Sequence, residues 1–138
     1  MTAYLDTSAL LRIVLREPGA LEDLRSYEAL VSSELIGVES ARTIDRLRIQ
    51  GSLTTREAAE RTRAVNEWLE AIDLVLLRPP VLSRASEPMP IPMGTLDALH
   101  LATALIWRDR MGPLPEMATH DAALGAAARA FGFHVRGI

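Results

Sequence analysis

The chain has 138 residues and a mass of 15.1 kDa, which is the size of one ordinary domain. Apolar residues make up 49% and charged residues 24%, a composition that excludes wholesale disorder. The chain lacks cysteine and all 15 of its basic residues are arginine, so disulfides, thiolate metal sites and lysine chemistry are excluded. The net charge of −3 gives no global basic footprint for a nucleic acid.

Short apolar runs alternate with segments of helical periodicity along the chain. Helix starts are marked by cap residues at Asp6 and Thr95 and by a capping box from Thr54 to Glu57. In the first part of the chain we expect strands over 3–5, 30–31 and 74–77, and helices over 9–15, 20–27, 35–49 and 54–71. A helix over 81–87 is then followed by an irregular proline-rich segment over 87–94. In the remainder we expect helices over 96–110 and 122–131, and strands over 117–119 and 133–135.

This alternation predicts a single domain over 1–138 of the α/β class, in which helices cover both faces of a parallel sheet. We expect a three-layer α/β/α sandwich with a five-stranded parallel sheet. No apolar run approaches the roughly 18 residues of a membrane span. The first residues, 1–6, lack a basic region and are not typical of a signal peptide. We therefore expect a cytoplasmic protein with no membrane partner.

Four acids hold positions where such folds place chemistry. Asp6 ends the first strand and Asp121 follows the fourth, and open parallel sheets form their sites at the carboxyl ends of strands. Glu39 and Asp97 lie near the starts of two helices. An acid in a first helical turn is also stabilised by the helix dipole, by about 0.3–1 kcal/mol, so for Asp97 or Asp121 taken alone a capping or solvated role is the favoured interpretation.

The surroundings of Asp97 favour a shared site. Its helix, 96–110, is apolar nearly all round, so it should be buried and its first acid recessed in a cleft. Two carboxylates about 5 Å apart repel by roughly 3 kcal/mol at an effective dielectric near 20. A group of four therefore requires a cation or shared protons. Hard oxygen ligands of this kind suit Mg²⁺ or Mn²⁺.

Four segments carry these acids: Tyr4–Leu10, Ser33–Arg42, Leu96–Ala104 and Ala118–Leu124. In this order and at this spacing they resemble the four motif blocks of PIN-domain ribonucleases, and more closely those of VapC-type toxins of toxin–antitoxin modules. The resemblance implies an α/β/α sandwich with a five-stranded parallel sheet. It also implies a Mg²⁺ or Mn²⁺ cofactor, RNA as substrate, and a homodimer that binds a cognate antitoxin protein.

By the same resemblance, the catalytic, metal-binding acids are Asp6, Glu39, Asp97 and Asp121. Thr7 or Ser8, together with Thr119, would support them as polar neighbours.

Glu34 is an alternative for the second acid, and Glu39 is preferred because Arg42 follows one turn later, as in the family. His120 stands where the family often has a large residue and is assigned no catalytic role. His100, in an apolar helix, is expected to be a core or supporting residue. The proline-rich segment before Asp97 departs from the family pattern and could alter access of the substrate.

The leading hypothesis is a metal-dependent endoribonuclease that hydrolyses RNA phosphodiester bonds and acts as a toxin. For RNA to bind, the metal and arginines would have to offset the negative charge of the acids. The candidate arginines are Arg12, Arg16, Arg42 and Arg46, for which a solvated helix face is the favoured interpretation. A catalytically silent binding module on the same fold is an alternative. A phosphoacceptor receiver domain would need a lysine, which is absent. A haloacid-dehalogenase-like phosphatase would need an aspartate where Ser8 stands.

Overall fold

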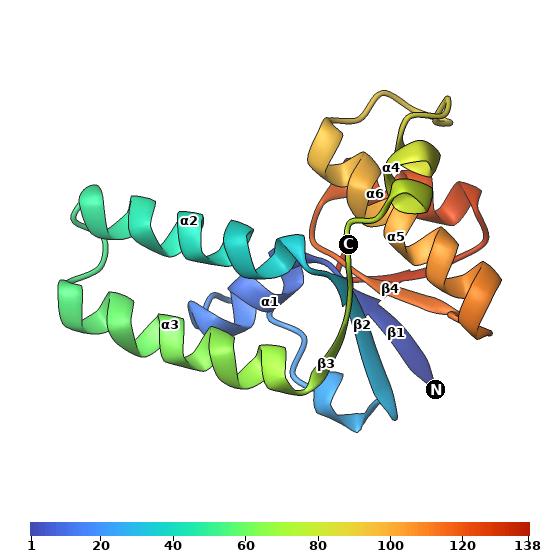
Figure 1. The fold of residues 1–138 in the computed structure, drawn as a ribbon. Helices are drawn as coiled ribbons and strands as arrows, with labels where there is room; N and C mark the ends of the chain where they lie inside the picture. Colours follow the sequence, from blue (N-terminus) through green and yellow to red (C-terminus); the bar gives the residue numbers. More distant parts are fainter.

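Five parallel strands form the centre of the computed structural model, which describes residues 1–138 (Figure 1). Their spatial order is β3-β2-β1-β4-β5, and every neighbouring pair is parallel. The strands are β1 (Thr2–Leu5), β2 (Ala29–Ser33), β3 (Ile72–Val75), β4 (Glu116–Ala118) and β5 (His134–Arg136). The predicted five-stranded parallel sheet is therefore confirmed.

Helices cover both faces of this sheet. They are α1 (Thr7–Val14), α2 (Leu35–Ile49), α3 (Thr55–Glu70), α4 (Pro79–Ala85), α5 (Thr95–Met111) and α6 (Ala122–Ala130). Residues of α1, α2 and α3 join one hydrophobic cluster with one face of the sheet, and α5 and α6 join a second cluster with the other face. Helix α4 packs against α5. The predicted three-layer α/β/α sandwich is confirmed.

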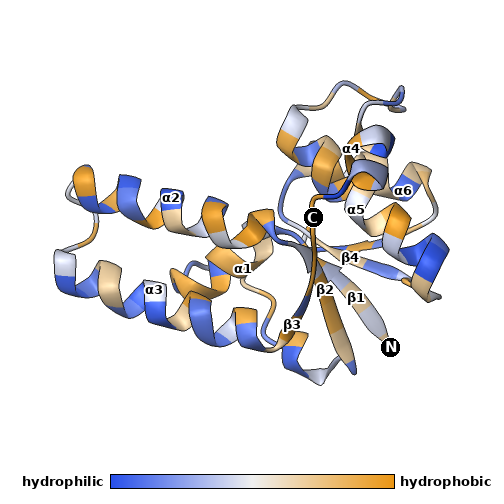
Figure 2. Cartoon of the chain, viewed as in Figure 1, coloured by the Kyte–Doolittle hydropathy of each residue, from blue (hydrophilic) through white to orange (hydrophobic).

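The alternation of side chains along β1 shows why both faces are covered. Ala3 and Leu5 point into the first cluster and Tyr4 points into the second, and all three are fully buried. A strand buried on both sides must be apolar throughout, as in most parallel sheets. Figure 2 shows β2 as mainly hydrophobic, whereas α2 and α3 alternate between hydrophobic and hydrophilic positions.

Helices α2 and α3 form a hairpin that extends from the sheet as an arm (Figure 1). The predicted capping box is present at the start of α3. The Thr54 hydroxyl accepts from the Glu57 N–H at 3.0 Å, and the Thr54 N–H donates to the Glu57 carboxylate at 3.0 Å. Such a cap stabilises a helix start by about 1 kcal/mol. The two helices pack on each other and both contact α1, and α2 carries Glu39.

Two predicted elements are wrong or displaced. The helix expected over 20–27 is only a short 3₁₀ turn, Leu24–Ser26, because Leu24 alone in this segment is buried. The strand expected over 74–77 lies two residues earlier. Its register is set by Ile72, which is buried and pairs with Leu30, whereas Leu76 is 46% exposed.

The starts of α4 and α5 also differ from expectation. Helix α4 begins at Pro79 rather than near 81, because prolines fit the first helical turn, where no N–H bond is required. Thr95 does not cap α5. It is the first residue of that helix, and Gly94 holds the cap position without a side-chain hydrogen bond.

Candidate active site

The strand order changes direction between β1 and β4, and the crevice at such a point is where open α/β sheets bind ligands. Asp6 follows β1 directly and caps α1, with its carboxylate accepting from the Ser8 N–H. Asp121 lies just beyond β4 and caps α6, where its Oδ1 accepts from the Leu124 N–H at 2.8 Å. Two of the four predicted acids therefore share this crevice.

Hydrogen bonds from residues that follow β1 and β4 fix the Asp6 side chain. Its Oδ2 accepts from the Ser8 hydroxyl at 2.6 Å and from the Thr119 hydroxyl at 2.8 Å. Its Oδ1 lies 3.6 Å from Nε2 of His100. The side chain of Asp6 is 6% exposed, so this carboxylate depends on these neighbours rather than on water.

Glu39 approaches the same crevice from α2. Its Oε1 accepts from the Thr7 hydroxyl at 2.8 Å and lies 2.6 Å from Nε2 of His100. Burial acts to raise the pKa of Glu39, but the hydrogen bonds and charge of His100 and the bond from Thr7 outweigh it and lower that pKa below its usual value. The structure thus links Glu39 to Asp6 through the neighbours that they share.

Asp97 lies in the first turn of α5 and is influenced by the other three acids. Burial, followed by the negative charges of Asp121, Asp6 and Glu39, raises its pKa to about 6, against a smaller opposing effect of His100. Asp97 therefore lies within electrostatic reach of Asp121, Asp6 and Glu39. We call these four acids the site acids.

Glu34, the alternative second acid, lies elsewhere. Its side chain is exposed and accepts from the Leu77 N–H at 3.1 Å, just beyond β3. Only Glu39 of the two faces His100.

His120 has no hydrogen bond to the site acids. Its Nδ1 lies 2.7 Å from the Gly137 carbonyl and 3.1 Å from a guanidinium nitrogen of Arg12, and its backbone N–H donates to Ser8. These contacts attach the C-terminal residues to α1 and to the end of β4.

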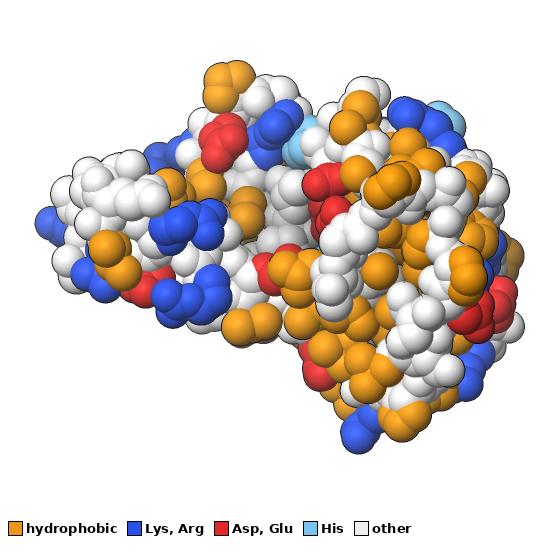
Figure 3. Space-filling model, turned by 90° about the horizontal axis from the view of Figure 1, so that it is seen from above, with side chains coloured by type: hydrophobic (Ala, Val, Ile, Leu, Met, Phe, Trp, Pro, Cys, Tyr) orange, Lys and Arg blue, Asp and Glu red, His pale blue; other side chains and the backbone are white.

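The donor chemistry of the cluster fits a divalent cation. All four site acids offer oxygen, and none of the arginines forms an ion pair with them. No three histidine, aspartate or glutamate side chains are arranged as a ready-made ligand set. Figure 3 shows acidic side chains in a hollow between the α2–α3 arm and the opposite half of the molecule, with basic side chains along the arm.

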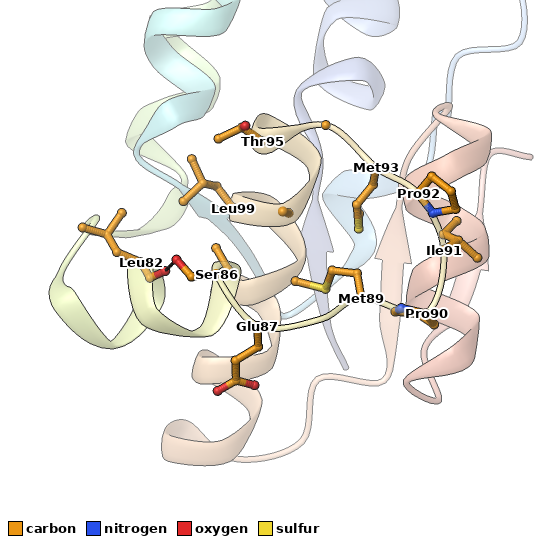
Figure 4. Close-up of a pocket in the computed structure, with 13 residues that line it drawn as sticks. Leu82, Ser86, Glu87, Met89, Pro90, Ile91, Pro92, Met93, Thr95 and Leu99 are labelled. Carbon is orange, nitrogen blue, oxygen red and sulfur yellow. Dashed lines mark hydrogen bonds between the residues drawn. The ribbon is translucent and has the colours of Figure 1, made fainter.

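The largest cavity lies outside this cluster. It has a volume of about 790 Å³ and opens between α4, the start of α5 and the loop over 87–94 (Figure 4). Met89, Ile91 and Met93 of that loop also pack against the second hydrophobic cluster. Its lining is mainly apolar, so it offers few groups for acid–base chemistry, in contrast to the crevice.

Comparison with known proteins identifies the family. The family described as PIN domain matches residues 3–110. This chain belongs to the PIN domain family. The chain is 34% identical over 136 residues to Ribonuclease VapC46 of Mycobacterium tuberculosis, with 96% of this chain and 94% of that protein covered. It is 30% identical over 132 residues to Ribonuclease VapC47 of the same species, with 94% and 92% covered.

Solved structures share the fold of this PIN domain. The structure of VapBC2 from Rickettsia felis, bound to a DNA fragment from their promoter, matches with a TM-score of 0.67 and 12% identity, covering 99% of this chain and 98% of that one. PAE2754 from Pyrobaculum aerophilum matches with a TM-score of 0.62 and 19% identity, covering 97% and 89%.

PIN membership bears on the alternatives drawn from the sequence. PIN-domain ribonucleases generally use divalent metal ions. Receiver domains have the strand order 2-1-3-4-5, which differs from the order β3-β2-β1-β4-β5 of this PIN domain. The receiver alternative therefore fails on topology as well as on the missing lysine. None of the helices is long and apolar enough to cross a membrane.

Proposed function

We propose that this chain is a divalent-metal-dependent endoribonuclease that hydrolyses RNA phosphodiester bonds and acts as the toxin of a toxin–antitoxin pair. The observation that carries this proposal is the group of four site acids, in which burial and then the charges of Asp121 and Asp6 raise the pKa of Asp97 to about 6, and with which no arginine forms an ion pair. Two relatives that span nearly the whole chain are named as ribonucleases and support the same activity.

The residues that would hold the cation are Asp6, Glu39, Asp97 and Asp121. A bound Mg²⁺ or Mn²⁺ supplies a centre that polarises phosphate and makes hydroxide available at neutral pH. Asp6 and Glu39 are held in place by Ser8, Thr119, Thr7 and His100. Fixed carboxylates need no rearrangement as charge develops during the reaction, which is the basis of electrostatic preorganisation.

A surface hollow beside Glu39 offers a path for RNA. It has a volume of about 330 Å³, and its lining includes Arg42, Arg46 and the exposed side chains of Val38 and Leu96. Arg42 is bound to Asp45 at 2.9 Å, whereas Arg46 forms no ion pair. Arg46 is therefore the arginine best placed to contact a phosphate next to the cleavage site.

The test is cleavage of labelled RNA by the purified protein with Mn²⁺ or Mg²⁺, with EDTA as the metal-free control. Metal-dependent cleavage that is lost in Asp6→Asn supports the proposal. A well-folded protein that binds RNA but never cleaves it, with either ion, would instead identify the catalytically silent module.

The proposed partners are a cognate antitoxin, which restrains the nuclease in the cytoplasm of its own cell, and a second copy of the chain. The open edge strand β3 exposes Leu74, and beyond it Leu76 is 46% exposed, while Met111 at the end of α5 is 69% exposed. A second copy would bury this apolar surface. A monomer in sedimentation at micromolar concentration would exclude the dimer. Failure of the product of the adjacent upstream reading frame to co-purify would count against the antitoxin.

A further inference from the structure

A line of buried hydrogen bonds runs beneath the site acids, from the backbone of β2 to Glu39. The Ser33 N–H donates to the Tyr4 oxygen at 3.2 Å, and the Tyr4 oxygen lies 2.7 Å from Nδ1 of His100. On the other side of the imidazole, Nε2 lies 2.6 Å from Oε1 of Glu39. Tyr4 is fully buried and His100 is 1% exposed, so water does not compete for these bonds.

The partners determine which nitrogen carries the hydrogen. Because a carboxylate only accepts, the 2.6 Å contact with Glu39 requires a hydrogen on Nε2 of His100. In the neutral imidazole Nδ1 then carries no hydrogen and accepts from the Tyr4 hydroxyl. A protonated imidazole also has a hydrogen on Nε2, so the bond to Glu39 survives in both charge states.

This bond connects two helices on opposite sides of the hollow. Glu39 lies on α2, and His100 lies on α5 one turn after Asp97, on the same helical face. With the Thr7 hydroxyl as a second donor, Oε1 of Glu39 is fully engaged, and Oε2 has no hydrogen-bond partner in the protein. A glutamate without these donors would lose this orientation, because its long side chain has many rotamers in a partly exposed place.

We infer that His100 is a positioning residue, which holds Glu39 toward the other site acids through Nε2 while Tyr4 fixes the imidazole. The inference rests on the proposed function, since it concerns the cation that Glu39 would help to bind. Asp6 is not the main partner of His100, because its Oδ1 lies 3.6 Å from Nε2, beyond a hydrogen bond. A purely structural histidine would affect the stability of the fold and leave the affinity for the cation unchanged.

Two substitutions separate positioning from packing. In His100→Gln the amide nitrogen reaches the place of Nε2 and can still donate to Glu39, whereas in His100→Asn the shorter amide reaches only the place of Nδ1. We expect His100→Asn to weaken Mn²⁺ binding, measured by calorimetry, by about 10–100-fold, which is typical of a lost hydrogen-bond partner of a metal ligand. His100→Gln should recover most of this loss. The RNA cleavage rate at saturating substrate should follow the same order.

Leu105→Val is the matched control on the same helix, since Leu105 is buried and has no contact with Glu39 in the hydrogen-bond network. It should lower the melting temperature while leaving Mn²⁺ affinity unchanged. Equal Mn²⁺ affinity in the wild type, His100→Asn and His100→Gln would overturn the inference and leave the nuclease assignment intact. A wild type that neither binds Mn²⁺ nor cleaves RNA would instead remove the proposed function.

A measurement on the wild type covers the case in which the His100 variants fail to fold. Nitrogen-15 NMR of the imidazole distinguishes a hydrogen on Nε2 from one on Nδ1 alone. A hydrogen on Nε2 that couples across the bond to Glu39 supports the inference. An imidazole with Nε2 unprotonated would overturn it, even in an active nuclease.

Discussion

Two groups of charged side chains on the same sheet are built in opposite ways. We call one group the paired cluster; it consists of Asp23, Tyr27, Glu116 and Arg136. Arg136 donates to Asp23 at 2.8 and 2.9 Å and to the Tyr27 oxygen at 2.7 Å. The Tyr27 hydroxyl in turn donates to Glu116. The bonds from Arg136 lower the pKa of Asp23, whereas burial and like charges raise the pKa of Asp97 in the other group.

The difference is the one expected between acids that stabilise the fold and acids that would bind a cation, as we propose for the site acids. In the paired cluster the positive charge of Arg136 balances Asp23, and Tyr27 links Arg136 to Glu116, whereas the site acids have no arginine partner. The site acids repel one another, and a fold retains such repulsion only where something outside the chain relieves it. Substitutions in the two groups should therefore have opposite effects on activity and on stability.

The largest expected effect is loss of cleavage in Asp6→Asn or Asp97→Asn. Cation-assisted charge stabilisation amounts to several kcal/mol, so we expect the rate of RNA cleavage to fall by about 10³-fold or more. The same substitutions remove one charge from a repulsive cluster, so without metal the melting temperature should stay equal or rise. Cleavage kinetics and thermal melts with and without Mn²⁺ measure both effects. A variant that cleaves at the wild-type rate, or melts far below it, contradicts this assignment.

The next effect concerns Glu39. Glu39→Gln removes the charge, and Glu39→Asp shortens the side chain that reaches His100 from α2. We expect both to lower cleavage by about 10–100-fold. Glu34→Gln is the matched control, because Glu34 is exposed and bonds only to the backbone N–H of Leu77. If Glu34→Gln were inactive and Glu39→Gln active, the assignment of Glu39 as the second acid would be wrong.

The positions of the site acids followed from the sequence to a large extent, because strand ends and helix starts are local features. Alternating strands and helices fixed the sheet, and its carboxyl edge then brought Asp6 and Asp121 together. The boundaries of α2 were also predicted to the residue. Whether the four acids bind metal stays a prediction.

The hydrogen bonds of His100 could not be predicted from the sequence, because they join it to Glu39 and Tyr4, which are 61 and 96 positions away along the chain. Which partners meet across a core depends on strand order and on which face of β1 carries Tyr4. One clue was available: His100 lies three residues after Asp97, and therefore on the same face of an otherwise apolar helix. The displaced β3 has a similar cause, since pairing with β2 rather than local hydrophobicity sets its register.

A smaller effect, on stability alone, is expected in the paired cluster. Tyr27→Phe removes the hydroxyl between Glu116 and Arg136. Loss of hydrogen bonds to charged partners should cost about 1–2 kcal/mol. This corresponds to a decrease of about 3–8 °C in melting temperature. RNA cleavage at a temperature where both proteins are folded should match the wild type. Reduced cleavage there would show that the two groups are coupled, and would weaken the distinction between them.

The smallest effect is the pH dependence of stability that Asp97 contributes. Its pKa is raised to about 6 in the folded protein, mainly by burial and then by Asp121 and Asp6. The usual pKa of an aspartate is near 4, so between about pH 4 and pH 6 the folded state binds more protons than the unfolded state. Stability from this group is therefore complete below pH 4 and is lost as the pH rises through 6. Solvent screening of a partly exposed carboxyl limits the loss to about 1 kcal/mol.

Asp97→Asn should remove this dependence, because asparagine does not titrate. Melting curves of the metal-free protein at pH 4.5 and 7 measure the contribution: the wild type should lose stability relative to Asp97→Asn as the pH rises. The difference between the wild type and Asp23→Asn, in the paired cluster, should not show this trend, because Arg136 lowers the pKa of Asp23. Saturating Mn²⁺ should reverse the wild-type loss at pH 7, since a cation binds the charged carboxylates. If the wild type and Asp97→Asn kept a constant difference across this range, Asp97 would not be held in a repulsive cluster, and the contrast between the two groups would disappear.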